Sequence, residues 1–151
     1  IARELVYGSR PRIPDEKVVT HKELKDYVNQ ALSMAFGQFI HGLEYNGSKR
    51  KFSRTYQTNN GVSCNIIAVP DNMSTSLLTE EKCTFNSYKT RDPTGEIQLQ
   101  LEGYTCNVGL GILKIRHIQD NTMTRYVINL NESIAIDLIE RYILRTLLPY
   151  L

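Results

Sequence analysis

The expected fold depends mainly on the stretches EIQLQLEGY (96–104), NVGLGILKIRHI (107–118) and MTRYVINL (123–130). In the first stretch apolar residues alternate with polar ones, Ile97, Leu99 and Leu101 against Glu96, Gln98, Gln100 and Glu102. Alternation with a period of two is typical of a strand that buries one face. DPTG (92–95) forms a turn before the first stretch, and DNT (120–122) turns the chain between the second and the third. The sequence therefore predicts an antiparallel meander over residues 96–130.

Helical patterns lie on either side of this segment in the chain. THKELKDYVNQALSMAFGQFIHG (20–42) begins with Thr20 and Glu23, which match a capping box, and its apolar residues recur at spacings of three and four. NESIAIDLIERYILRTLLPYL (131–151) is also helical in pattern, but it is apolar over more than one stripe. Such a helix lies deep between layers, or a second chain covers part of it.

Between the first helix and the meander, the sequence predicts a hairpin followed by a long loop. Strands over 50–57 and 62–69 flank Asn60-Gly61, a strong signal for a tight turn. Residues 70–82 show no clear period and are predicted to form a loop. Together these elements predict one α+β domain over 20–151, with about five antiparallel strands and a helix from each end packed on the sheet. Residues 1–19 are predicted to form an extended, proline-containing arm.

Composition restricts the class of protein only broadly. The 151 residues carry a net charge of +2 and a pI of about 8.4, too mild to indicate a nucleic-acid partner by charge alone. No apolar run approaches the ~20 residues of a membrane helix. Cys64, Cys83 and Cys106 form no C-x-x-C motif, so neither disulfides nor a zinc site is indicated. A reducing compartment, the cytoplasm or nucleus, is the corresponding expectation.

Catalytic patterns are weak in this sequence. His21 and His41 lie at opposite ends of one predicted helix, so they cannot share a metal. Folding could bring a thiol and an imidazole together, for example Cys106 with His117, but a buried structural thiol is the simpler interpretation. The adjacent Glu80 and Glu81 are interpreted as solvating residues of the 70–82 loop. The sequence thus predicts no enzyme, no metal, no cofactor and no small-molecule substrate.

A basic stretch, GSKRKFSRTY (47–56), interleaves cations with aromatic rings. The candidate residues for binding a nucleic acid or an anionic membrane surface are Lys49, Arg50, Lys51, Phe52, Arg54 and Tyr56. In a strand, one face would present alternating guanidinium groups and rings, which suits phosphates and stacked bases. The alternative is that the rings face the core and the cations surround them.

Surplus apolar residues suggest self-association. The candidate contact residues come from the 70–82 loop and the last helix, namely Leu77, Leu78, Ile136, Tyr142, Leu144 and Leu148. The first functional hypothesis is a non-enzymatic structural module that binds itself or a protein partner, of the kind found in viral matrix or capsid-associated proteins. The second is a single-stranded nucleic-acid-binding protein that uses residues 49–56. The third is a small cysteine hydrolase.

Overall fold

The computed structural model describes residues 1–8, 21–44, 50–85 and 93–147, and the fold is α+β, as the sequence predicted. The elements in chain order are α1 (Ala2–Tyr7), α2 (His21–Glu44), β1 (Phe52–Gln57), β2 (Ser63–Ala68), β3 (Asn72–Met73), β4 (Leu78–Thr84), α3 (Pro93–Cys106), β5 (Leu110–His117), β6 (Thr122–Asn129), α4 (Glu132–Tyr142) and a π-helical turn η1 (Ile143–Leu147). Six strands lie in these ranges, close to the five expected. Part of the predicted extended arm, residues 2–7, forms helix α1, and residues 9–20 lie outside the described part.

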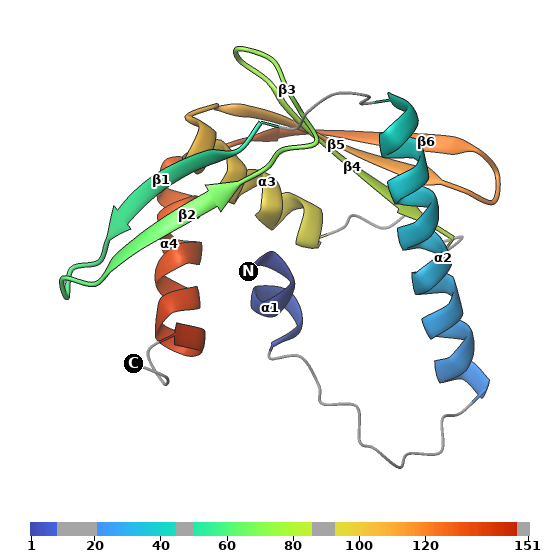
Figure 1. The fold of residues 1–151 in the computed structure, drawn as a ribbon, viewed down its shortest axis with the longest axis horizontal. Helices are drawn as coiled ribbons and strands as arrows, with labels where there is room; N and C mark the ends of the chain where they lie inside the picture. The colour runs from blue at the N-terminus through green and yellow to red at the C-terminus, as the bar shows by residue number, and fades with distance from the viewer. Residues whose placement is uncertain (9–20, 45–49, 86–92, 148–151) are drawn as a thin grey trace.

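The strands form two sheets (Figure 1). β1 and β2 form an antiparallel hairpin, as expected around Asn60-Gly61, and Gly61 takes the positive φ of 82° that such a turn requires. The second sheet has the order β3-β4-β5-β6, and its central pair, β4 and β5, is parallel. Because parallel neighbours need a crossover, the chain passes through α3 between them. The larger sheet is therefore mixed, and not the antiparallel meander predicted over 96–130.

The meander prediction failed at residues 96–102, which belong to helix α3. The alternating pattern misled because α3 is enclosed by other elements. Its buried residues are Gly95, Leu99, Gln100, Leu101, Glu102, Gly103, Tyr104 and Thr105. A helix buried on nearly every side has no continuous polar face, so it shows no 3.6-residue period. Pro93 at its first position, where no backbone donor is needed, is the local signal for the helix start.

Two hydrophobic clusters lie on either side of α3. One joins Leu101 and Tyr104 of α3 to Ile66 of β2 and to Ala135, Leu138, Ile139 and Ile143 near the C-terminus. The other joins Leu99 to Val108, which lies between α3 and β5, and to Leu78, Leu113, Ile115 and Ile128 of the larger sheet. Helix α3 thus lies between the hairpin and the sheet, with α1 and α4 beside it (Figure 1).

The two faces of β4 meet different helices. Lys82 donates a hydrogen bond from Nζ to Gln98 Oε1 of α3 at 2.9 Å. The next residue, Cys83, approaches Gly37 of α2. Because successive strand side chains point to opposite faces, α3 and α2 cover opposite faces of the sheet. In the described ranges, no helix combines the length and apolar character needed to cross a membrane.

Helix α4 begins as the sequence predicted. The side chain of Asn131 caps it by accepting a hydrogen bond from the backbone N–H of Ser133 at 2.9 Å. The backbone N–H of Asn131 in turn donates to Gln100 Oε1 at 2.9 Å, while Gln100 Nε2 donates to the carbonyl of Asn129. These bonds satisfy a buried amide of α3 and fix the junction between β6 and α4.

Candidate functional site

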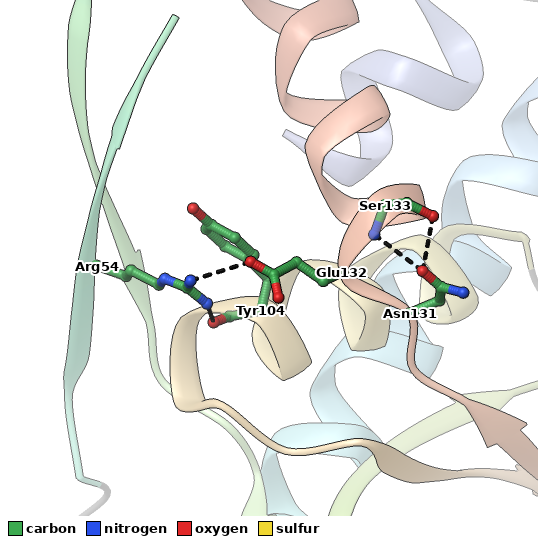
Figure 2. Close-up of polar contacts among 5 residues, drawn as sticks. All are labelled: Arg54, Tyr104, Asn131, Glu132 and Ser133. Carbon is green, nitrogen blue, oxygen red and sulfur yellow. Dashed lines mark hydrogen bonds and ion pairs between the residues drawn. The ribbon is translucent and has the colours of Figure 1, made fainter.

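The basic strand predicted to bind phosphate turns much of its candidate face inward. Phe52, Arg54 and Tyr56 alternate with exposed residues along β1 and are each only partly exposed. Figure 2 shows Arg54 extending from β1 to α3 and to the start of α4. Its guanidinium donates to the carbonyl of Tyr104 at 2.8 Å and to Glu132 Oε1 at 3.1 Å.

The Arg54 guanidinium also stacks on the Tyr104 ring, 3.9 Å from its centroid. Beside it, the hydroxyl of Tyr56 donates to Glu140 Oε1, and this hydrogen bond raises the pKa of Tyr56 to about 12. Both side chains therefore attach the hairpin to the helices. This arrangement matches the interpretation in which the rings face the protein.

The remaining basic candidates differ in position. Arg50 and Lys51 are exposed at the start of β1, and the Arg50 guanidinium lies 5.2 Å from the centroid of Phe52. Lys49 lies outside the described residues. Of the described candidates, Arg50 and Lys51 are thus the two cations that this stretch presents to solvent.

The candidate residues for self-association differ in how deeply they are buried. Leu78 is fully buried in the protein's own core, because it begins strand β4 and is not part of a loop. Ile136 packs against the core of the same chain, and Leu77 and Tyr142 are half-buried. Leu144 is 57% exposed. Leu148 lies outside the described residues.

The acidic pair interpreted as solvating proves to be buried. Glu80 and Glu81 lie in the middle of β4, and each is only 2% exposed. Glu81 accepts two hydrogen bonds from Arg116 of β5, at 3.2 and 3.3 Å. Glu80 points to the opposite face, toward α3. The sequence interpretation failed because residues 70–82 show no clear period and were predicted to form a loop, whereas Glu80 and Glu81 lie in a central strand between two layers.

Glu80 begins a chain of polar contacts on the α3 face. Lys82 Nζ lies 2.9 Å from Glu80 Oε1 and donates to Gln98 Oε1, also at 2.9 Å. Gln98 Nε2 donates to Glu102 Oε1 at 3.1 Å. Glu102, one helical turn after Gln98, is itself buried. One lysine is thus held between the carboxylate of a strand and the amide of a helix.

A further carboxylate, Asp71, approaches from β3. Asn72 pairs with Thr79 across the antiparallel β3–β4 ladder, so the preceding Asp71 comes opposite the following Glu80. The backbone N–H of Glu81 donates to Asp71 Oδ2 at 3.0 Å, which fixes this carboxylate beside β4. We name the group of Asp71, Glu80, Lys82, Gln98 and Glu102 the acid–lysine cluster.

Burial dominates the electrostatics of the acid–lysine cluster. Burial and, to a smaller extent, the charges of Asp71 and Glu102 raise the pKa of Glu80 to about 8, against the opposing effect of Lys82. Within the described residues, no group donates a hydrogen bond to Glu80 Oε2, although this atom is fully buried. A buried carboxylate oxygen of this kind is costly unless a cation or a proton satisfies it.

A pocket of about 490 Å³ opens next to the cluster. Lys82, Gln98 and Glu102 form part of its polar wall, and Ile67 and Val69 of the hairpin belong to the apolar side. Arg3 of α1 also lines it. The cluster is therefore accessible through the lysine, while Glu80 lies behind Lys82.

The thiol–imidazole pair considered from the sequence gains no support. Burial and, to a smaller extent, the charge of Glu102 raise the pKa of the Cys106 thiol to about 11, so the thiol stays protonated near neutral pH. His117 is buried on the inner face of β5, where Nε2 lies 2.9 Å from Thr124 Oγ1. Neither residue has the environment of an activated nucleophile.

Sequence reasoning missed the acid–lysine cluster, although a signal was present. Leu78, Glu80 and Lys82 share one face by the strand period of two, so a carboxylate and a lysine follow a core leucine on the same side. Asp71 precedes them directly after Pro70. Charged residues are seldom fully buried unless they are paired, so charges on the apolar face of a buried strand are an informative signal.

Comparison with known proteins finds a similar fold and no family. No family model matches the chain, and no curated protein matches it. Among solved structures, the crystal structure of SSO0001 is similar, with a TM-score of 0.62 and 21% sequence identity. The similarity covers 83% of this chain and 66% of SSO0001, so this chain spans slightly less than two thirds of that protein's length. At this identity the likeness shows the α+β fold alone.

Proposed function

We propose that this protein is a divalent-cation-dependent hydrolase that cleaves phosphodiester bonds in nucleic acid, and that the acid–lysine cluster is its active site. The observation that carries the proposal is Glu80, a carboxylate buried in the central strand beside Lys82, with one oxygen that no described group satisfies. A structural carboxylate would be expected to have its hydrogen bonds completed, as Glu81 has on the other face. Buried charge of this kind next to a pocket is typical of functional sites.

The charge balance favours a divalent cation. Three acidic side chains interact here with one lysine between them in the balance of charge: Glu80 pairs with Lys82, and the charges of Asp71 and Glu102 act on Glu80. In the described residues, no set of three or more acidic, histidine or cysteine side chains is arranged to hold a metal. Mg²⁺ does not need such a set, because it keeps several waters and is commonly bound by one or two carboxylates together with substrate phosphate. Asp71 and Glu80 are the residues that would hold it.

The proposed reaction is the addition of water across a phosphodiester. The oxygen of water bonds to phosphorus, the bond from phosphorus to one sugar oxygen breaks, and that oxygen leaves as an alcohol with a proton supplied by solvent. The proton released by the attacking water passes to solvent. A bound divalent cation supplies charge neutralisation for the phosphate and a more acidic water. Lys82, which faces the pocket, would stabilise the negative charge that develops on the phosphate oxygens.

The pocket beside the cluster suits a nucleotide strand. Its apolar side includes Ile67 and Val69, which are both exposed, and its polar side contains Lys82, with Arg3 also in the lining. Bases pack on apolar surface while phosphates contact cations. The exposed Arg50 and Lys51, candidates from the sequence, lie at the start of the same hairpin. In this proposal the nucleic acid expected as a partner is the substrate.

The test combines cation binding with cleavage. Calorimetric titration with Mg²⁺ and with Mn²⁺ should show binding to the wild type that is lost in Asp71→Asn and Glu80→Gln. Labelled single-stranded and duplex DNA and RNA should be cut by the wild type only with the cation present. Lys82→Met should bind the cation and fail to cut.

Matched controls lie elsewhere on the same chain. Asp137→Asn removes an exposed carboxylate of α4 that pairs with Arg141, and Lys114→Met removes a lysine of β5. Both should keep the wild-type behaviour. The proposal is refuted if the folded wild type binds neither cation, or if it binds one and cuts none of the four substrates.

A partner-binding module remains the second candidate, and helix α2 favours it. In the described part of the chain, α2 contacts the rest mainly through β4. Large apolar side chains are exposed along it, namely Val28, Leu32, Met34, Phe36 and Phe39. Exposed apolar surface of this extent commonly marks an interface. Light scattering over a concentration series tests self-association, and a mass that stays monomeric throughout would exclude a homo-oligomer.

A further inference from the structure

Glu102 occupies an unusual place for a buried acid, and its contacts suggest a role in the reaction. It lies on α3, four residues after Gln98, so the two side chains share one face of the helix. Gln98 Nε2 donates to Glu102 Oε1 at 3.1 Å, and Gln98 Oε1 accepts from Lys82 Nζ at 2.9 Å. Glu102 is therefore connected to Lys82 by two hydrogen bonds through the Gln98 amide.

We propose that Glu102 is a positioning residue, which orients the Gln98 amide so that its oxygen holds the Lys82 ammonium in the pocket. This inference rests on the proposed function. An amide presents an acceptor at one end and two donors at the other, whereas an ammonium only donates and an ionised carboxylate only accepts. With Lys82 on one side and Glu102 on the other, one orientation of Gln98 satisfies both neighbours. The flipped amide would oppose donor to donor and acceptor to acceptor.

The orientation matters because Lys82 contacts both the strand and the helix. Its ammonium lies 2.9 Å from Glu80 Oε1 and the same distance from Gln98 Oε1. A lysine side chain is a flexible four-carbon stem, so a missing partner lets the charge relocate. Without the Gln98 oxygen, the ammonium would lose its contact with α3 and could move further toward Glu80, where it competes with a bound cation. With that oxygen in place, Lys82 keeps a defined position when Glu80 binds the cation.

The pocket supports this assignment. Lys82, Gln98 and Glu102 all line the same pocket of about 490 Å³. The chain of hydrogen bonds therefore runs along the wall that substrate would contact. A network with a purely structural role would be expected to close within the core, as Gln100 does between Asn129 and Asn131 on the other side of α3.

Two variants test the inference, and the second restores the negative charge that the first removes. Glu102→Leu removes the acceptor, so the Gln98 amide loses its fixed orientation. We expect kcat to fall on the order of 10- to 100-fold, with KM and the cation affinity little changed. Adding Gln98→Glu to Glu102→Leu places a carboxylate directly against Lys82. Because a carboxylate accepts with either oxygen, this double variant should recover most of the lost kcat.

A second readout does not depend on activity. The hydrogen-bonded ammonium of Lys82 should give a slowly exchanging cross-peak in ¹H–¹⁵N spectra of lysine side chains, assigned with Lys82→Arg. The cross-peak should disappear in Glu102→Leu and return in the double variant. Persistence of the cross-peak in Glu102→Leu, or an unchanged kcat, overturns the positioning role.

The same spectra separate this inference from the proposed function. If the wild type cuts no substrate, the proposed function fails, and the inferred catalytic role of Glu102 fails with it, whatever the spectra show. If the wild type is active and the double variant stays as slow as Glu102→Leu while remaining folded, the proposed function stands and the positioning role of Glu102 is refuted.

Discussion

Replacing Glu80 with glutamine should make the cation-free protein more stable at high pH. Burial raises the pKa of Glu80 from an ordinary value of 4.5 to about 8. An acid whose pKa is raised on folding favours the folded state fully below its unfolded pKa and loses that advantage as pH rises through the folded value. The loss therefore falls between about pH 4.5 and pH 8.

The size of the effect follows from this interval. At roughly 1.4 kcal/mol for each pH unit, the upper limit is about 5 kcal/mol of unfolding free energy. The pKa of about 8 already includes the favourable charge of Lys82, which lies 2.9 Å away, so we expect a difference of several kcal/mol, up to this limit. Glutamine has the same shape and no charge. At about pH 5 the two proteins should be of similar stability, and by about pH 9 the Glu80→Gln variant should be clearly more stable.

Urea unfolding at several pH values, in the presence of a chelator, measures this difference. Mg²⁺ should then stabilise the wild type at the alkaline end and leave Glu80→Gln unaffected, because a ligand that binds only the folded state shifts the equilibrium toward it. Asp137→Asn serves as the control and should follow the wild type throughout. Parallel pH curves for wild type and Glu80→Gln would refute the claim that Glu80 ionises at a cost within the fold.

Other substitutions test the packing around the site. Arg54→Met should lower the unfolding free energy by about 1–3 kcal/mol, since it removes the bonds to Tyr104 and Glu132, and it should leave cleavage by the folded fraction unchanged. A loss of nucleic-acid affinity without a loss of stability would contradict this. Gly103→Ala should cost about 1–3 kcal/mol in thermal unfolding, because the new Cβ would lie 2.7 Å from Leu130 Cδ1, and an unchanged midpoint would show that the neighbours relax freely. Alkylation of Cys106 in the folded protein should accelerate up to a pH of about 11, and a plateau near neutral pH would contradict the raised pKa.

Much of the architecture could be predicted from the sequence, because local signals and tertiary packing agree there. The spacing over 20–42 predicted helix α2, Asn60-Gly61 predicted the β1–β2 hairpin, and the helical pattern that begins at residue 131 predicted α4. In each case the deciding residues act on their own backbone or on neighbours a turn away. Such signals do not depend on the rest of the fold.

The rest could not be predicted, because it depends on which elements surround a segment. Residues 96–102 alternate as a strand does, yet they form a helix enclosed by the hairpin and the sheet. Glu80 and Glu81 read as solvated charges, yet they lie in the parallel pair at the centre of the sheet. The interaction of Lys82 with Gln98 joins a strand to the helix that follows it. The acid–lysine cluster therefore becomes visible only once the β4–α3–β5 crossover is known.

The two faces of strand β4 carry different charged residues, so the proposed site depends on the register of β4 against β5. Glu80 and Lys82 face α3, while Glu81 between them faces Arg116. A slip of one residue against β5 would exchange these faces and direct the wrong glutamate toward the pocket. Such a trapped species would keep its strands and helices and give a native-like far-ultraviolet spectrum, yet it would be inert. Because parallel pairing forms slowly, the recovery of cleavage after dilution from denaturant should lag behind the recovery of secondary structure.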